Sequence, residues 1–281
     1  MRSIRGKKAI VTGAASGIGR AIALELAKEG AALFLLDIDA TKLDATAQEA
    51  RSYGAEVVTT VCDLSDSAQI SEAVSYFRTV WGRLDILVNN AGVAYYGGTH
   101  LMTEEQWRRI VSVNLMAPMQ LIHTLLPTLL LAGDAHILNV CSIFGLAPWR
   151  KTTTYQATKY GLVGLTAALR AEYFHANLGA TALCPGFVQT SLLQEATTAH
   201  PAWRKSLVPW FCTTPEHVAR KAVRAIQRNQ GTVVITPLAH IYWRLARLFP
   251  SLADWLVRQG WHRTTKLVRF EHDHQVVLPS E

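Results

Sequence analysis

At 281 residues, 49% of them hydrophobic, the chain has enough apolar side chains to fill the core of one domain. It shows no internal repeat or low-complexity tract, which excludes solenoid and linker-rich architectures. The formal net charge of +7 is not accompanied by a nucleic-acid-binding motif, so we expect no nucleic-acid partner.

Strand-like apolar runs alternate with helical segments along the chain. The runs are Lys8–Thr12, Ala32–Asp37, Glu56–Cys62, Leu84–Asn89, His136–Cys141, Thr181–Cys184 and Thr232–Thr236. This alternation predicts a mainly parallel sheet with helices on both faces. We therefore expect an α/β fold with one Rossmann-like, doubly wound domain and a sheet of about seven strands. The domain covers residues 1–237, and residues 238–281 form a helical C-terminal extension.

The first strand is followed by a glycine-rich turn. Residues 12–19 read Thr-Gly-Ala-Ala-Ser-Gly-Ile-Gly, and apolar residues at Ile18, Ile22 and Leu26 predict a helix after the turn. Glycine allows a pyrophosphate to approach the backbone, and the free N–H groups and dipole of the helix face its charge. The spacing Gly-x-x-x-Gly-x-Gly differs from the usual Gly-x-Gly-x-x-Gly fingerprint. Alone it indicates nucleotide binding but leaves a plain structural turn as the alternative.

The second strand ends in Asp37, eighteen residues after Gly19. An acidic side chain there can accept hydrogen bonds from the adenosine ribose and repels a 2′-phosphate. NADP would favour a nearby cation, but Ser16 and Ile38 occupy the positions where a cation could help. We therefore interpret the cofactor as NAD(H). The alternative is that Asp37 only caps a helix or ends a strand.

Tyr155 lies thirteen residues after Ser142, and Lys159 follows Tyr155 by four residues. A free tyrosine has a pKa of about 10 and is a poor base at neutral pH. A lysine one helical turn away lies on the same face, and its charge should lower the pKa of the tyrosine. Ser142 can bind a substrate oxygen as charge develops on it. The pattern predicts proton transfer, and the simpler alternative is a solvated helix pair.

In combination, these motifs resemble the classical short-chain dehydrogenase/reductase family from about Gly6 to Pro237. The resemblance also includes Asp63-Leu64, the Asn-Asn-Ala-Gly motif of residues 89–92 and the Pro-Gly-x-x-x-Thr motif of residues 185–190. It implies that Lys159 also binds the nicotinamide ribose, and that a water held by Asn114 passes protons to solvent. The implied catalytic residues are Asn114, Ser142, Tyr155 and Lys159. The implied dinucleotide contacts are Gly13, Ser16, Gly17, Ile18, Gly19, Asp37, Asp63, Leu64, Asn90, Ala91, Gly92, Tyr155, Lys159, Pro185, Gly186, Val188 and Thr190.

The family resemblance implies an NAD(H)-dependent oxidoreductase that interconverts a secondary alcohol and a ketone. In this family residues 187–211 form a mobile lid, which is apolar here at Leu192, Leu193, Trp203, Leu207, Val208, Trp210 and Phe211. Leu146, Pro148 and Trp149 would form the opposite wall, and only Gln189, Gln194 and Glu195 could bind hydroxyls or charge. We therefore expect a steroid-like, long-chain or aromatic substrate. The alternatives are an NADPH-type 3-oxoacyl reductase, or a catalytically silent nucleotide-binding sensor or scaffold.

The family also forms four-helix contacts between subunits. Apolar residues at Val163, Leu165 and Ala168 are compatible with a homodimer or homotetramer, although they could equally face the sheet. The first residues lead directly into the first strand without a secretory signal, so we expect a cytoplasmic, reducing location. We expect the apolar segment Leu121–Ala132 to be too short to span a bilayer.

We predict no metal site. Cys62, Cys141, Cys184 and Cys212 lack Cys-x-x-Cys spacing, and the first three lie at strand ends as small buried residues. His272-Asp273-His274 is interpreted as part of a hydrated tail rather than a metal clip.

The C-terminal extension combines apolar, aromatic and basic residues. Ile241, Leu245, Leu248, Leu252 and Leu256 recur at helical spacing, interrupted by Pro250, which can open a second helix. They are accompanied by Trp243, Trp255, Trp261, Arg244, Arg247, Arg258, Arg263, Lys266 and Arg269. Such a hairpin can lie on an anionic membrane. We favour instead that the apolar stripe packs over the substrate cleft or against another subunit, because Arg and Trp are common at ordinary interfaces.

Overall fold

The computed structural model describes residues 1, 3–190, 197–198, 212–259, 269–270 and 276–277. Its centre is a seven-stranded sheet in the order β3-β2-β1-β4-β6-β7-β9, and each pair of neighbours is parallel. The strands are β1 (Lys8–Thr12), β2 (Ala32–Asp37), β3 (Val57–Val61), β4 (Ile86–Asn89), β6 (Ala135–Val140), β7 (Leu178–Pro185) and β9 (Thr232–Ile235). The predicted α/β fold is confirmed, with β7 beginning at Leu178 rather than Thr181.

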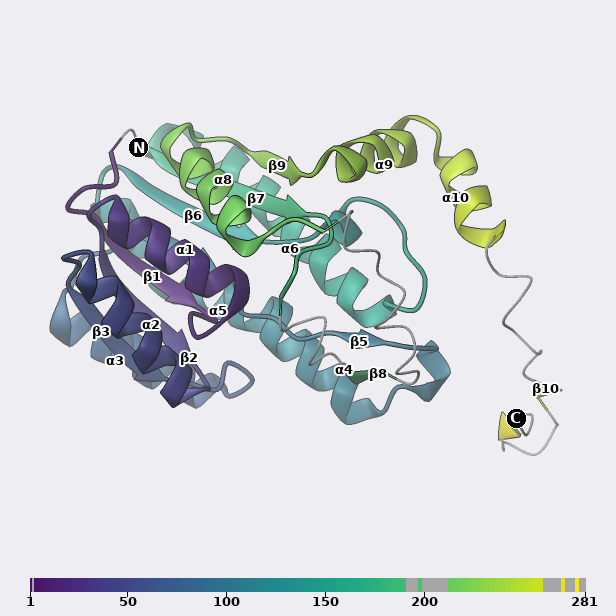
Figure 1. Cartoon of the computed structure of the whole chain (residues 1–281), viewed down its shortest axis with the longest axis horizontal. Helices are drawn as coiled ribbons and strands as arrows, with labels where there is room; N and C mark the ends of the chain where they lie inside the picture. The colour runs from purple at the N-terminus through teal and green to yellow at the C-terminus, as the bar shows by residue number, and fades with distance from the viewer. Residues whose placement is uncertain (2, 191–196, 199–211, 260–268, 271–275, 278–281) are drawn as a thin grey trace.

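Helices cover both faces of the sheet (Figure 1). One face carries α1 (Gly17–Lys28), α2 (Ala40–Ser52) and α8 (Pro215–Gln227). The other carries α3 (Ser67–Val80), α5 (Ala117–Leu131) and α6 (Thr153–Glu172). Shorter elements are the α-helix α4 (Glu104–Val111), the π-helical turn η2 (Ser112–Met116) and the 3-10 turns η1 (Thr99–Leu101), η3 (Ile143–Gly145) and η4 (Phe174–Ala176).

The two faces of β2 show why its sequence is a continuous apolar run. Successive strand side chains point to opposite faces. Leu33 and Leu35 pack into the cluster that contains α1, α2 and α8. Phe34 and Leu36 pack into the cluster that contains α3 and α5. Since both faces are covered, neither needs polar side chains, as is usual for parallel sheets.

The strand order reverses between β1 and β4. β2 and β3 lie on one side of β1, whereas β4, β6, β7 and β9 lie on the other. The loops that leave the carboxyl ends of β1 and β4 therefore diverge and open a crevice, which is where ligands bind in open α/β sheets. The glycine-rich turn after β1 and the Asn-Asn-Ala-Gly segment after β4 lie at this point.

The continuous helical segment Glu104–Leu131 is longer than the apolar segment expected from the sequence. By length and composition alone this segment of 28 residues could cross a membrane, since an 18-residue window within it has a mean hydropathy of 1.3. Within it, however, Leu121, Leu125 and Leu129 pack into the core beneath the sheet. Core helices of soluble proteins can be equally long and apolar, and the burial of these side chains accounts for the apolar composition.

The C-terminal helices follow β9. α9 (Pro237–Leu248) and α10 (Pro250–Gln259) extend away from the β9 edge of the sheet, and α10 packs on α9 (Figure 1). Pro250 opens α10, as predicted. Short two-stranded ladders join β5 (Tyr95–Tyr96) to β8 (Thr197–Thr198) and β10 (Arg269–Phe270) to β11 (Val276–Val277).

The predicted apolar stripe of the extension does not cover the cleft within this chain. Ile241 and Leu248 are exposed, whereas Ala239 is buried and Tyr242 and Trp243 pack inward. The part of the expectation that places the stripe over the cleft is therefore wrong. Ala239, Tyr242 and Trp243 form the inward side of α9, because the helix leaves β9 with this side toward the core. Packing of the stripe against another subunit stays a prediction. Trp261, Arg263 and Lys266 lie outside the described residues.

Candidate active site

The ends of β1 and β4 are joined by hydrogen bonds at the crevice. The buried Thr12 hydroxyl accepts from the backbone N–H groups of Asn90 and Ala91 at 2.9 and 3.1 Å and lies 3.3 Å from the Val88 carbonyl. The Asn90 side chain donates to the carbonyls of Thr12 and Gly13 at 3.0 and 3.1 Å. Two motifs 78 residues apart thus hold each other in place.

The glycine turn leaves no room for side chains. Gly13 has a φ of +65°, and a Cβ there would lie 2.8 Å from the Cα of Ala91 and from Nδ2 of Asn90. A Cβ on Gly19 would lie 2.0 Å from the Gly13 carbonyl oxygen. The helix α1 therefore starts close to the sheet, with its N-terminus directed into the crevice. This arrangement fits a pyrophosphate, which helix N-termini bind through free N–H groups.

Asp37 lies at the opposite side of the turn with its carboxylate held by the backbone. One oxygen accepts from the N–H of Ala15 at 2.9 Å and the other from the N–H of Asp39 at 3.0 Å. Asp37 therefore ends its strand in a tight turn, which was the alternative interpretation of this residue from the sequence. It also lines the cavity and offers acceptor oxygens there. The two roles are compatible.

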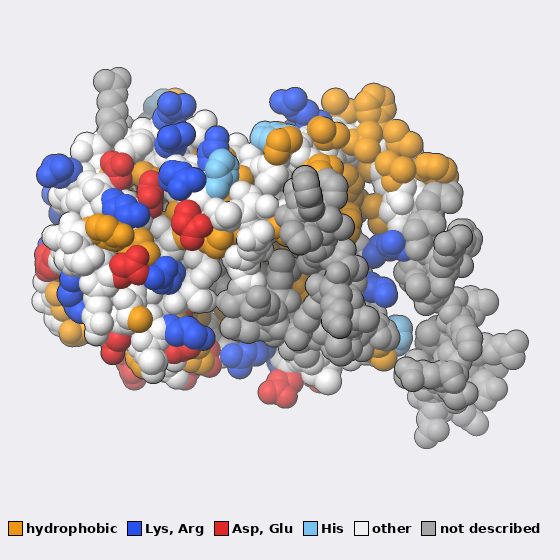
Figure 2. Space-filling model, in the orientation of Figure 1, with side chains coloured by type: hydrophobic (Ala, Val, Ile, Leu, Met, Phe, Trp, Pro, Cys, Tyr) orange, Lys and Arg blue, Asp and Glu red, His pale blue; other side chains and the backbone are white. Residues whose placement is uncertain are grey.

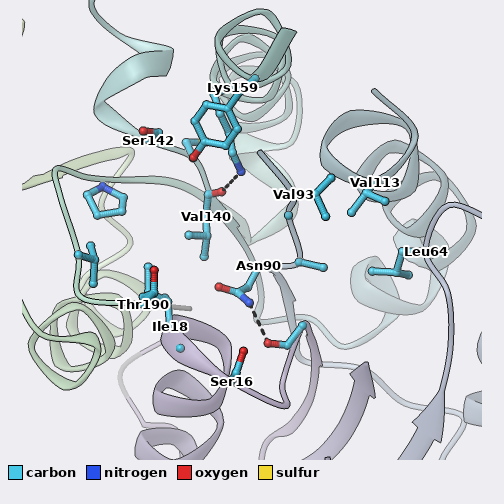
Figure 3. A pocket seen from close by; sticks show the side chains of 18 of the residues that line it. Ser16, Ile18, Leu64, Asn90, Val93, Val113, Val140, Ser142, Lys159 and Thr190 are labelled. Atoms are coloured by element: carbon cyan, nitrogen blue, oxygen red, sulfur yellow. Dashed lines mark hydrogen bonds between the residues drawn. The ribbon is translucent and has the colours of Figure 1, made fainter. Parts of the chain in front are cut away.

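Ser142, Tyr155 and Lys159 meet at the other end of the cavity. Ser142 follows β6, and the other two lie one turn apart on α6. The Lys159 ammonium donates to the carbonyl of Val140 at 2.8 Å and lies 5.6 Å from the centre of the Tyr155 ring. In Figure 3, Ser142 and Lys159 lie at one side of the cavity, Ser16 and Ile18 at the opposite side, and Asn90 between them.

The titration of these groups differs from the expectation based on spacing. Burial raises the pKa of Tyr155 to about 12, and a hydrogen bond from Ser142 offsets this only in part. Burial also lowers the pKa of Lys159. The loss of solvation disfavours the charged form of each residue and is the largest cause of each shift. Tyr155 therefore carries its proton at neutral pH in this arrangement.

Asn114 lies behind this group in the π-helical turn η2 rather than in a regular helix. Its side chain accepts from the N–H of Val93 at 2.8 Å and donates to the carbonyl of the same residue at 2.9 Å. A further contact reaches the Thr158 hydroxyl at 3.4 Å. Asn114 thus fixes the loop after β4 against α6. Single π-turns of this kind often occur at functional sites.

The cavity has a volume of about 280 Å³ and brings together nearly all of the residues singled out in the sequence. Gly19 and Asn114 are not on its wall and support it from behind. Those that line it are Gly13, Ser16, Gly17, Ile18, Asp37, Asp63, Leu64, Asn90, Ala91, Gly92, Ser142, Tyr155, Lys159, Pro185, Gly186, Val188 and Thr190. The predicted lid residues Leu192, Leu193, Gln194, Glu195, Trp203, Leu207, Val208, Trp210 and Phe211 lie outside the described residues.

The substrate end of the cavity is aromatic. Phe144 and Phe187 line it and pack edge to face, with ring centres 5.9 Å apart. Trp149, predicted on the wall, stacks behind Phe144 at 5.3 Å. Tyr242 of α9 packs on Trp149 at 6.1 Å and donates a hydrogen bond to the carbonyl of Pro148. The C-terminal extension therefore supports this wall.

Sequence reasoning missed several cavity residues, and two of them carry polar or charged groups. Tyr96, on β5, is buried close to Tyr155, and Arg109 contributes an exposed cation from α4. Neither belongs to a recognisable motif. The adjacent arginines on α4 were a signal, but only the fold shows that Arg109 reaches the cavity.

A buried chain of polar side chains positions α6. The Asn89 amide donates to Asn139 at 2.8 Å, and Asn139 donates to the Thr166 hydroxyl at 2.8 Å. Thr166 in turn donates to the carbonyl of Leu162 at 2.6 Å. Because buried polar groups are costly without partners, this chain fixes one position of α6 on β4 and β6. The helix that carries Tyr155 and Lys159 is thereby held in place.

The sequence profile of the short chain dehydrogenases matches residues 7–201. The chain belongs to the short-chain dehydrogenase/reductase family. The putative oxidoreductase SadH of Mycobacterium tuberculosis is 32% identical over 267 residues, covering 92% of this chain and 97% of that protein. A short chain dehydrogenase/reductase from Burkholderia phymatum, solved with NAD, has a TM-score of 0.82 at 28% identity, covering 90% of this chain and 96% of that one.

A second solved relative carries the other dinucleotide. Actinorhodin polyketide ketoreductase with NADPH has a TM-score of 0.74 at 27% identity, covering 84% of this chain and 97% of that one. Membership of the short-chain dehydrogenase/reductase family therefore makes this protein an oxidoreductase with a dinucleotide-binding Rossmann fold. It does not by itself choose between NAD and NADP.

Among the described residues, no group of three His, Cys, Asp or Glu side chains is placed to hold a metal ion. Cys62, Cys141 and Cys184 are buried, as predicted for small apolar residues at strand ends. The segment His272-Asp273-His274 lies outside the described residues.

Proposed function

We propose that this short-chain dehydrogenase/reductase is an NAD(H)-dependent oxidoreductase that interconverts an apolar secondary alcohol and a ketone. The observation that carries the proposal is one continuous cavity. It has the glycine turn and Asp37 at one end, and Ser142, Tyr155 and Lys159 at the other. A dinucleotide bound along it would supply or accept a hydride.

The residues of the chain handle the proton and the substrate oxygen. In ketone reduction, the Tyr155 hydroxyl donates its proton to the carbonyl oxygen, and the Ser142 hydroxyl donates a hydrogen bond to the same oxygen. Because the pKa of Tyr155 is raised to about 12, the acid form is present at neutral pH. Alcohol oxidation requires the opposite form, which burial disfavours. We therefore propose that reduction uses the form of Tyr155 that prevails at neutral pH, whereas the rate of oxidation rises with pH, and that Lys159 holds the nicotinamide ribose.

An apolar substrate is supported by the wall on which it would lie. Phe144, Phe187 and Ile143 line the catalytic end of the cavity, with Tyr96 beside Tyr155. Aromatic rings contribute large apolar contact area and little hydrogen bonding. A steroid-like, long-chain or aromatic ketone suits this surface better than a polyol does.

NAD(H) is supported by Asp37, whose carboxylate lies on the wall where an adenosine ribose would bind and would repel a 2′-phosphate. A second candidate is an NADPH-dependent ketoreductase of the 3-oxoacyl type. Arg109 favours it, because this cation lines the same cavity. We place NAD(H) first because Asp37 is held in position by two backbone N–H groups, whereas Arg109 is exposed.

We also propose a cytoplasmic homodimer or homotetramer. Val163 and Leu165 are only partly buried on α6 and Ala168 is exposed, which supports a subunit contact there. Analytical ultracentrifugation tests the assembly, and a monomer at micromolar concentration would contradict it.

The experiment is a substrate screen with both dinucleotides, read by absorbance of the reduced cofactor. Apolar ketones such as decalones and long-chain 2-ketones are compared with keto sugars, each with NADH and with NADPH. We expect turnover of apolar ketones with NADH and little or none of keto sugars. Turnover that prefers NADPH would replace the first candidate by the second. Binding of a dinucleotide without turnover of any ketone would favour a nucleotide-binding sensor or scaffold.

A further inference from the structure

The C-terminal helices expose a continuous run of large apolar side chains. Ile241 and Leu248 on α9 are 66% and 69% exposed, and Trp255 on α10 is 53% exposed. Figure 2 shows hydrophobic side chains gathered over this end of the molecule. We call this surface the C-terminal face, and its residues are Leu238, Ile241, Leu248, Phe249, Leu252, Trp255 and Leu256.

The face is not a loosely packed part of the core. The opposite side of α9 is well packed, since Ala239 is buried and Tyr242 contacts Trp149 of the aromatic wall. On α10, Ala253 is buried against α9. The two helices therefore have a defined inner side, and the C-terminal face is the side that remains. Scattered exposed apolar residues are normal, but a contiguous group of this kind indicates a binding surface.

Arginines border the apolar residues on α9. Arg244 lies three residues after Ile241 and four before Leu248, so it shares their side of the helix. Arg244 and Arg247 are both exposed, and within the described part of the chain neither forms an ion pair. On α10, Asp254 is the acidic side chain, and it is paired with Arg258 at 2.9 Å. The face therefore combines apolar groups with free positive charge.

This charge argues against a second copy of the chain as the occupant. In a two-fold contact, the same patch of each subunit faces its counterpart. Each copy would then bring Arg244 and Arg247 into the contact, while Asp254, the acidic side chain of the described part of the face, is already paired with Arg258. Desolvated like charges weaken such a contact. An occupant that is both apolar and anionic has no such conflict.

We propose that the C-terminal face docks on an anionic lipid membrane. Leu, Ile, Phe and Trp side chains insert between the headgroups, while the arginines remain at the level of the lipid phosphates. Tryptophan is suited to this boundary because its ring is apolar and its N–H is polar. The contact is peripheral, since α9 and α10 have 12 and 10 residues and neither can span a bilayer.

The test is co-sedimentation of the full-length protein with sucrose-loaded vesicles. One set contains phosphatidylcholine and phosphatidylglycerol, the other phosphatidylcholine alone, and each is used at low and high salt. We expect the wild type to sediment with the anionic vesicles at low salt and to be released at high salt. Absence of binding to anionic vesicles at low salt would overturn the proposal.

Apolar variants show whether the C-terminal face is the part that binds. Ile241→Ser combined with Leu248→Ser and Leu252→Ser removes three exposed side chains and should abolish sedimentation with vesicles. The matched control is Leu131→Ser with Phe174→Ser, which removes side chains that are 88% and 68% exposed on other parts of the molecule. The control should bind like the wild type. Equal loss in both variants, or in neither, would show that the face is not the docking surface.

Charge variants test the arginines separately. Arg244→Gln with Arg247→Gln should weaken binding about fivefold for each charge removed and reduce its salt dependence. Arg220→Gln with Arg224→Gln, two exposed arginines on α8, changes the net charge equally and should have little effect. Circular dichroism of each variant confirms folding. A different outcome would contradict the proposal. If the wild type is a dimer that does not bind vesicles, and the Ile241→Ser, Leu248→Ser, Leu252→Ser variant is a monomer in ultracentrifugation, the occupant of the face is a second copy.

Discussion

Asn114 binds both backbone groups of Val93, accepting from its N–H at 2.8 Å and donating to its carbonyl at 2.9 Å. This contact joins the π-helical turn to the loop that follows β4. A Cβ built on Gly92, the neighbour of Val93, would lie 3.4 Å from Oδ1 of Asn114 and 3.7 Å from Nζ of Lys159. The contact between Asn114 and Val93 thus fixes the part of the cavity wall next to Lys159.

Asn114→Ala should therefore impair both stability and turnover. The variant leaves the N–H and C=O of Val93 without their partner, which should lower the free energy of unfolding by about 1–3 kcal/mol. The kcat should fall at least about tenfold as the loop beside Lys159 loosens. Urea denaturation and steady-state kinetics measure the two effects. Gln120→Ala, at an exposed amide farther along the same helical segment, should change stability by less than about 0.5 kcal/mol. A wild-type kcat in Asn114→Ala would show that the contact between Asn114 and Val93 does not support catalysis.

The choice of cofactor is tested at Asp37. Asp37→Asn keeps most of the hydrogen bonding to the turn but removes the charge, so affinity for NADP(H) should rise relative to NAD(H). Asp37→Ala should also reduce the difference in affinity between NAD(H) and NADP(H). It should in addition lower the stability of the fold, because the N–H groups of Ala15 and Asp39 lose their acceptor. Fluorescence titration of NADH and NADPH measures both. Tighter binding of NADPH than NADH by the wild type, lost in Arg109→Gln, would assign the second candidate instead.

The pH dependence follows from the raised pKa of Tyr155, about 12, caused first by burial. Alcohol oxidation needs the deprotonated tyrosine, whose fraction rises about tenfold per pH unit below the pKa. The oxidation rate should therefore climb steadily through the neutral and mildly alkaline range, whereas ketone reduction should stay nearly flat there. Rate profiles in both directions provide the measurement. A plateau of the oxidation rate near neutral pH would show that Lys159 lowers the pKa of Tyr155, as its spacing suggested.

The glycine turn gives a prediction about close packing. Gly19→Ala places a Cβ 2.0 Å from the Gly13 carbonyl oxygen, so the turn must move and dinucleotide binding should be lost. Gly164→Ala, on the exposed side of α6, is the matched control, because apart from the neighbouring residues and backbone of its own helix no atom lies within 4 Å of the new Cβ. It should bind dinucleotide normally and gain about 0.5–1 kcal/mol in stability. Calorimetric titration compares the two, and normal binding by Gly19→Ala would contradict the tight turn.

The sequence predicted those features that local patterns determine. Apolar runs marked the strands because a two-sided parallel sheet leaves no polar face, and the glycine turn and the Tyr155–Lys159 spacing marked the two ends of the cavity. Features made by distant residues were not predictable in this way. The hydrogen-bonded chain through Asn139 and Thr166, the aromatic wall completed by Tyr242, and the contribution of Arg109 all depend on tertiary contacts.

The pKa of Tyr155 illustrates the same limit. Helical spacing correctly placed Lys159 one turn away, but spacing contains no information on burial. In the folded protein the side chains of both residues are removed from water, and desolvation dominates the electrostatics. A charge effect predicted from sequence therefore changed direction once the depth of the site was known.

The most direct test of the central claim is a comparison of wild type with Tyr155→Phe, using NADH and the best apolar ketone from the screen. Burial of the ring and its contacts is retained in the variant, whereas the proton donor is lost. We predict nearly unchanged NADH affinity and a kcat lower by at least about 10²-fold. A kcat within a few-fold of wild type would contradict the assignment of Tyr155 as the proton donor and, with it, the proposed mechanism.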